Sequence, residues 1–181
     1  MNARLWASAA ALCLALAPAF GQQVAAPEVR IKAAFLYKFC DFIEWPPESI
    51  GEPGAPITIG VLGADALADE LTRAVAGRTV GNRPVQVRKL RRGAPLVGLQ
   101  VLFVGGQDAA RLEDVFEPAR GLPLLTVTET RGEQAQGSMI NFVLVDEKVR
   151  FDVALPPAEA GRLRISSRLL AVARKVVAGA S

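Results

Sequence analysis

Apolar positions in the middle of the chain fall into two alternating patterns. Three runs dominated by apolar residues, ITIGVL, VLFVGG and LPLLTVTE, predict strands that are buried on both faces. Between these runs, apolar residues recur at helical spacing. The helical sets are Leu67, Leu71 and Val75 after the first run, and Leu112, Val115 and Phe116 after the second. This alternation predicts a largely parallel sheet with helices on its faces.

Local signals refine these elements. Asp65 and Asp108 stand where helix N-caps belong, directly before the two helical sets. The segment RPVQVRKL places Val85 and Val87 in alternation with polar residues, which predicts a further, half-buried strand between the first helix of this region and the second apolar run.

The last third of the chain has a different pattern. SMINFVLVDEKVRFDVAL predicts two strands joined at Asp146-Glu147-Lys148, and therefore an antiparallel hairpin. After a short helical turn, a final helix is expected, capped by Ser166 or Ser167. Its apolar face would comprise Leu169, Leu170, Ala173, Val176 and Val177. With no internal repeat, the fold class is a single α/β domain: a mixed, mostly parallel sheet flanked by helices in three layers, with an antiparallel C-terminal hairpin.

The segment KAAFLYKFCDFIEWPP, residues 32–47, predicts an unusually apolar helix. On a helical wheel, its apolar arc spans roughly 200° and exceeds the stripe that a surface helix normally buries. The arc comprises Ile31, Ala34, Phe35, Leu36, Phe39, Phe42, Ile43 and Trp45. Lys38 projects into this arc beside Ile31 and Phe42, and Lys32 sits near Phe39.

Two explanations fit this arc. The helix packs across the sheet and both lysines extend to solvent at its rim, or part of the arc faces a partner or a second copy of the protein. The candidate partner- or ligand-binding residues are Lys32, Phe35, Lys38, Phe39, Phe42 and Trp45.

The first residues have the features of a signal peptide. One positive charge near the start precedes an apolar run from Leu5 to Leu16 that is too short to span a bilayer comfortably. Small residues at Ala19 and Gly21 favour cleavage before Gln22, with a second possible cut before Phe20. Residues 1–21 are therefore interpreted as a signal peptide and 22–181 as the mature domain, exported and not inserted in the membrane after cleavage. An uncleaved N-terminal anchor is the alternative.

Signal cleavage would leave Cys40 as the mature chain's single cysteine, which excludes an intramolecular disulfide. Its place in the apolar helix predicts a buried free thiol, with a disulfide across a dimer as the alternative. A composition that is 51% hydrophobic and 22% charged is typical of a globular protein. The net charge of +3 is scattered, apart from the short run 88–92, so nucleic-acid binding is not expected.

The inventory of reactive side chains argues against an enzyme. The chain has no histidine, which excludes Ser-His triads, His-assisted cysteine chemistry and the usual zinc and haem ligand sets. Gly60 and Gly63 match neither nucleotide-binding glycine pattern. The carboxylates of Asp65 and Asp69, and of Asp146 and Glu147, fall where a helix start and a turn need them. The sequence predicts no catalytic residues, no metal site and no cofactor.

Several segments together resemble one known family. VRIKAAFLYKFCDFIEWPP near the expected mature N-terminus, ITIGVLG after it, and the terminal GRLRISSRLLAVARKV are similar to the YfiR family. VLFVGG, LLTVTE and GSMINFVLVDEKVRFDV fall where that family has its middle strands and hairpin. The resemblance implies a periplasmic, non-catalytic α/β protein, often a homodimer. It also implies a partner: the periplasmic sensor domain of an inner-membrane diguanylate cyclase, which such proteins repress, lowering cyclic-di-GMP and biofilm formation.

The chain departs from the family pattern at one informative place. Leu99-Gln100 precede Val101 where family members often have a cysteine, so redox control by disulfides does not carry over. A second hypothesis, from a different class, is a periplasmic small-molecule-binding protein. Its apolar, aromatic pocket would lie between the first helix and the sheet and be lined by Phe35, Phe39, Phe42 and Trp45.

Overall fold

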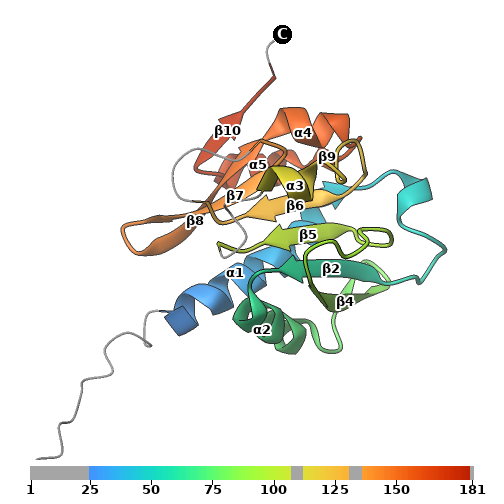
Figure 1. Ribbon diagram of the computed structural model, residues 1–181, viewed down its shortest axis with the longest axis horizontal. Coiled ribbons are helices and arrows are strands. Elements are labelled where there is room, and N and C mark those ends of the chain that lie inside the picture. The colour runs from blue at the N-terminus through green and yellow to red at the C-terminus, as the bar shows by residue number, and fades with distance from the viewer. Residues whose placement is uncertain (1–24, 107–111, 131–135, 180–181) are drawn as a thin grey trace, which may run out of the picture.

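The computed structural model describes residues 25–106, 112–130 and 136–179, and an eight-stranded mixed sheet forms its centre (Figure 1). The strand order is β10-β8-β7-β6-β5-β2-β4-β3. The strands are β2 (Ile57–Leu62), β3 (Thr79–Val80), β4 (Arg83–Leu90), β5 (Val101–Val104), β6 (Leu125–Thr128), β7 (Ile140–Val145), β8 (Lys148–Ala154) and β10 (Lys175–Val177). Neighbouring strands from β4 through β2, β5 and β6 to β7 are parallel, whereas β7 and β8 form the antiparallel hairpin. The predicted fold class is confirmed.

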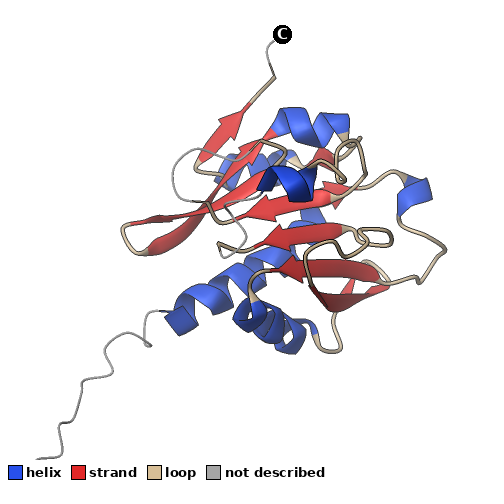
Figure 2. Ribbon diagram, in the orientation of Figure 1, coloured by secondary structure: helices blue, strands red, loops and turns tan. Residues whose placement is uncertain are grey.

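Helices cover both faces of the sheet (Figure 2). On one face, α1 (Ala25–Phe39) and α2 (Asp65–Val75) share a core with alternate strand residues such as Ile59 and Val61. On the other face, α3 (Leu112–Phe116) packs against Leu62 and Leu102. Because successive side chains of a strand point to opposite faces, the uniformly apolar strands supply both cores.

Smaller elements close one end of the domain. The 3₁₀ turns η1 (Cys40–Phe42) and η2 (Pro47–Ser49) flank β1 (Ile43–Glu44). The helices α4 (Leu155–Ala160) and α5 (Ser167–Val172) flank β9 (Arg164–Ile165). Strands β1 and β9 pair as a separate antiparallel ribbon, which brings the end of α1 next to the start of α5.

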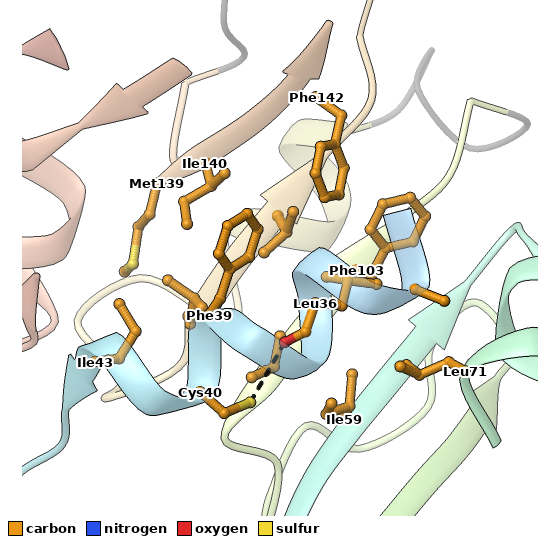
Figure 3. Close-up of a cluster of buried hydrophobic side chains, with 14 of the residues drawn as sticks. Leu36, Phe39, Cys40, Ile43, Ile59, Leu71, Phe103, Met139, Ile140 and Phe142 are labelled. Carbon is orange, nitrogen blue, oxygen red and sulfur yellow. Dashed lines mark hydrogen bonds between the residues drawn. The ribbon is translucent and has the colours of Figure 1, made fainter. Parts of the chain in front are cut away.

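Aromatic rings occupy the centre of the larger core (Figure 3). Phe39 from α1 is fully buried and lies 5.7 Å from Phe142 and 5.1 Å from Phe151, between ring centroids. Leu36 of α1 and Phe103 of β5 are also buried completely. α1 is therefore fixed to the sheet mainly by contacts with the C-terminal hairpin and the central strands.

The first helix is shorter than predicted. It ends at Phe39, and the expected continuation to Trp45 is wrong, because Ile43 and Glu44 pair with Ile165 and Arg164 in an extended conformation. Pro46 also disfavours helical geometry for the residue before it.

The final helix is shorter as well. Ser166 caps it as expected, accepting a hydrogen bond from the Arg168 N–H at 3.3 Å, but α5 ends at Val172. The expected helical positions Ala173, Val176 and Val177 are extended, the last two in β10 alongside β8. The Arg174 guanidinium donates to both oxygens of the Asp152 carboxylate, and the Arg174 backbone N–H donates to the Phe151 carbonyl, so this segment is held at the sheet edge.

The predicted N-caps have different outcomes. α2 begins at Asp65 itself, and Ala64 occupies the N-cap position without a side-chain hydrogen bond. The prediction that Asp65 is the cap is therefore wrong by one position, although a carboxylate in the first turn still favours the helix dipole. Asp108 and the predicted signal peptide lie outside the described residues.

Candidate functional site

The six candidate residues separate into a buried group and an exposed group. Phe39 has no exposed surface and belongs to the core. Lys32 is 8% exposed, so the expectation that both lysines extend to solvent is wrong for Lys32. Trp45 is half-buried beyond the end of the helix, where its Nε1 donates to the Gln100 carbonyl at 3.3 Å. Phe35, Lys38 and Phe42 remain as the residues that come together at the surface.

Lys32 is held in a buried charge cluster. Its Nζ donates to Glu129 Oε2 at 2.7 Å and to Glu28 Oε1, one helical turn earlier. Glu129 Oε1 accepts a further hydrogen bond from the Gly106 N–H at 2.8 Å. Burial on its own would lower the pKa of Lys32, but the hydrogen bonds to Glu129 and Glu28 outweigh burial and raise it above the ordinary value. The ammonium group is therefore charged at neutral pH.

Phe35, Lys38 and Phe42 line an apolar hollow of about 380 Å³ that the end of α1 forms with Phe151 of β8 and with α5. The lining residues are Ile31, Ala34, Phe35, Lys38, Phe39, Phe42, Phe151, Leu169 and Val172. We call this surface the α1–α5 hollow. Two of its apolar side chains are unusually open to solvent, Ile31 at 43% and Val172 at 66%. Lys38 supplies the charged group at its rim, 3.7 Å from Asp41.

The spacing along α1 explains why the hollow exists. Ala33, Leu36 and Phe39 form the stripe that packs on the sheet, and all three are fully buried. Ile31, Phe35 and Lys38 follow one another at intervals of three or four residues, which places them on a neighbouring side of α1, and Phe42 of η1 continues that side past the end of the helix. The predicted apolar arc is wider than the sheet alone can cover, because it combines two adjacent stripes: one packs on the sheet and the other lines the hollow.

Five lining residues were not among the six sequence-based candidates. Ile31 and Ala34 belong to the predicted apolar arc, whereas Phe151, Leu169 and Val172 come from the last third of the chain. These last three reach α1 through tertiary pairing, since Ile43 pairs with Ile165 and the Ser166 N–H donates to the Phe42 carbonyl at 2.9 Å. No local pattern connects residues so distant in the chain. The exposed apolar position of Val172 in an otherwise amphipathic segment was the available signal.

Cys40 lies beneath this region as a buried thiol. It is 2% exposed, and its Sγ donates to the Leu36 carbonyl at 3.5 Å (Figure 3). Burial, with a smaller contribution from the Asp41 charge, raises the pKa of the Cys40 thiol to about 12. A thiolate is therefore strongly disfavoured at neutral pH, and the thiol is not placed to react.

Within the described ranges, no cluster of three His, Cys, Asp or Glu side chains is arranged to hold a metal ion. None of the helices described for this chain has the length and apolar character needed to cross a bilayer. The α1–α5 hollow offers apolar contact area and one cationic group at its rim. This combination is suited to binding an apolar group that carries a negative charge nearby.

Comparison with known protein families gives a match for this chain. The model of the YfiR/HmsC-like family matches residues 29–174, from the first turns of α1 to the segment before β10. The chain belongs to the YfiR/HmsC-like family. This is a family of periplasmic, non-catalytic regulators of cyclic-di-GMP signalling, so the α1–α5 hollow lies in a regulatory protein. The comparison with curated proteins gives no match.

Proposed function

We propose that this protein is a periplasmic repressor of an inner-membrane diguanylate cyclase. It binds the periplasmic sensor domain of that enzyme through the α1–α5 hollow, and so lowers cyclic-di-GMP and restrains biofilm formation. Family membership supports the regulatory role. Export by a signal peptide comprising residues 1–21, and a mature domain from residue 22, belong to the same proposal.

One observation supports the choice of surface. Ile31 and Val172 stand open to solvent beside a recess lined by phenylalanine rings. Soluble domains seldom expose contiguous apolar patches unless these patches bind something. A recess of about 380 Å³ has room for large apolar side chains of a partner, and interface energy concentrates where such side chains fill a pocket. Lys38 at the rim would favour an acidic group on the sensor domain.

Homodimerisation is part of this proposal on the strength of the family resemblance. We assign the α1–α5 hollow to the sensor domain, so a dimer would use another surface. Light scattering of a hollow variant therefore provides a separate test, because its mass should match that of the wild-type protein even when capture of the sensor domain is lost.

The decisive experiment compares two glutamate variants. Val172→Glu introduces a charge at the hollow, whereas Val97→Glu introduces one at a position that is 85% exposed and outside the hollow. We expect Val172→Glu to weaken capture of the sensor domain by roughly tenfold or more, and Val97→Glu to leave it unchanged. In the host, deletion of the gene should raise cyclic-di-GMP, and Val172→Glu should fail to restore the lower level. Full capture and full complementation by Val172→Glu would contradict the proposal.

A second candidate function is small-molecule binding, and the same hollow favours it. Its volume lies in the range of ligand sites, and its lining is aromatic and aliphatic apart from Lys38. Three of the four predicted pocket residues, Phe35, Phe39 and Phe42, line this hollow together with Phe151 of β8, whereas Trp45 does not. Native mass spectrometry of the purified protein should show a co-purifying ligand that Val172→Glu removes. A spectrum without bound ligand, together with intact capture of the sensor domain, would contradict small-molecule binding and support the regulatory function.

A further inference from the structure

A second, larger hollow lies at the carboxyl ends of the parallel strands, away from the α1–α5 hollow. It has a volume of about 1020 Å³ and is lined by the carboxyl ends of β2, β4, β5 and β6 together with the first turns of α1 and of α2, which includes Asp65. We call it the carboxyl-edge crevice. Its floor lies between β2, which continues into α2 on one face of the sheet, and β5, which precedes α3 on the other face. Open α/β sheets bind ligands at such a switch point.

Bare backbone forms the floor of this crevice. Gly63 ends β2 with a φ of 69°, a conformation that favours glycine. A Cβ on Gly105 would lie 2.5 Å from the Gly63 carbonyl oxygen, so these two turns are in direct contact. Gly106, by contrast, has no positive φ, and a Cβ there would meet only Glu129 Oε1 at 3.7 Å. A ligand can therefore approach the main chain closely at Gly106.

The two ends of the crevice differ in charge. Arg91 and Arg92 follow β4 at one end, and Glu129 follows β6 at the other. With β2 and β5 between them, the two ends are three strand spacings apart, about 14 Å at the backbone. A compact zwitterion could not reach both ends. The crevice instead fits an elongated molecule with different chemistry at its two ends.

Each end retains capacity to bind such a molecule. Arg91 is exposed, and its side chain makes no hydrogen bond or ion pair within the described ranges. Glu129 accepts one hydrogen bond on each oxygen, from Gly106 and Lys32, whereas a carboxylate has about four acceptor positions. Lys32 is 8% exposed, lines the crevice and uses two of its three N–H groups on carboxylates. This buried charge cluster has no role in the α1–α5 hollow.

We propose that the carboxyl-edge crevice binds an elongated, anionic small molecule. Its anionic group, a phosphate or carboxylate, pairs with Arg91 and Arg92. Its body lies over the glycine floor, and hydroxyl or amine groups at its far end donate to Glu129. Guanidinium groups recognise phosphate and carboxylate well because they donate two parallel hydrogen bonds. This site is independent of the proposed repressor function and would give the protein a small-molecule input.

Three probes of graded composition test this site: AMP, adenosine and inorganic phosphate. In NMR titrations of the ¹⁵N-labelled mature protein, AMP should shift the amide signals of Gly63 and Gly106 and saturate. Adenosine, which lacks the anion, and phosphate, which lacks the body, should each bind at least about tenfold more weakly. Equal binding of phosphate and AMP would overturn the elongated-ligand assignment, and no response to AMP would overturn the site.

Matched variants locate the binding. Arg91→Gln with Arg92→Gln should weaken AMP binding by about tenfold or more, while Arg120→Gln, an exposed control that pairs with Glu117 on another surface, should not. Gly106→Leu should block the floor, and Gly106→Ala, whose Cβ has room, should keep the wild-type melting temperature as a control for the backbone change. AMP binding that survives both crevice variants would refute the assignment. Sensor-domain capture, measured in parallel, should be unchanged by either variant.

Discussion

Two ionisable residues, Lys32 in α1 and Cys40 directly after it in η1, respond to burial in opposite ways. Lys32 stays charged because two carboxylates surround its ammonium group, whereas Cys40 stays protonated because no cation offsets its burial and a backbone hydrogen bond does so only in part. The sequence placed both residues in the apolar helix, but it did not indicate which groups would contact either of them. Glu129, which fixes Lys32, comes from the far end of β6, and no local spacing indicated it.

The buried thiol leads to a reactivity prediction. At pH 8, the Cys40 thiol of the folded mature protein should react with DTNB far more slowly than the same thiol in urea, because a pKa of about 12 leaves almost no thiolate and the side chain is 2% exposed. The absorbance of the released product measures both rates. Similar rates in the two states would show that the thiol is accessible.

The charge cluster leads to a stability prediction. Lys32→Met should lower the free energy of unfolding by about 2 kcal/mol at neutral pH, because Glu28 and Glu129 lose their shared partner. Since folding raises the pKa of Lys32, its contribution is complete below the ordinary value of 10.5 and disappears as the pH rises through the folded-state pKa.

Urea denaturation at several pH values measures this effect. The difference between wild type and Lys32→Met should be constant at neutral pH and shrink only in strongly alkaline solution. Lys89→Met serves as the control, because its pair with Asp69 is solvent-exposed on both sides and should contribute little. A difference that disappeared on acidification below neutral pH, with both carboxylates still ionised, would contradict the assignment.

At the scale of elements, the sequence predicted the interior well and the ends poorly. Buried runs such as ITIGVL predict strands because only a doubly covered strand needs apolar residues on both faces. Phe35, Lys38 and Phe42 line one hollow, and their spacing along the chain indicated that they are neighbours because helical spacing is local. The helix ends were missed because Ile43 and Val176 are extended through pairing with β9 and β8, strands far away in the chain.

The contact between the β2 and β5 turns leads to a prediction about two neighbouring glycines. Gly105→Ala should destabilise the fold by about 1–3 kcal/mol, because its Cβ would lie 2.5 Å from the Gly63 carbonyl oxygen and 2.7 Å from Ala64 Cβ. Gly106→Ala should change stability by less than about 0.5 kcal/mol. Urea denaturation of both variants measures the contrast, and equal effects would show that the two turns do not touch.

For the whole molecule, α1 connects two surfaces of different chemistry. Its Ile31 and Lys38 border the apolar α1–α5 hollow, and its Glu28 and Lys32 border the charged carboxyl-edge crevice. A single helix thus contributes to the proposed partner surface and to the proposed ligand site.

Charge reversal at the rim tests the partner surface. Lys38→Glu should weaken sensor-domain capture several-fold while changing the free energy of unfolding by less than about 0.5 kcal/mol, since the side chain is 61% exposed and its Asp41 contact is long. Pull-down and urea denaturation of the same preparation measure the two effects. Lys175→Glu, an exposed position outside the hollow, is the matched control. Unchanged capture by Lys38→Glu would show that the rim does not meet the partner.

The stacking of Phe39 against Phe142 and Phe151 also determines when the protein can fold. α1 is made first during synthesis, but the rings that cover it belong to the hairpin near the other end of the chain. Contacts so distant in sequence slow folding, because a long loop must close before they stabilise anything. Until β7 and β8 emerge, α1 can pack against α2 and β2, but the rings that complete the core around Phe39 are missing. A nascent chain of this design cannot complete its core until it is nearly finished, and an incompletely folded polypeptide can be threaded across a membrane.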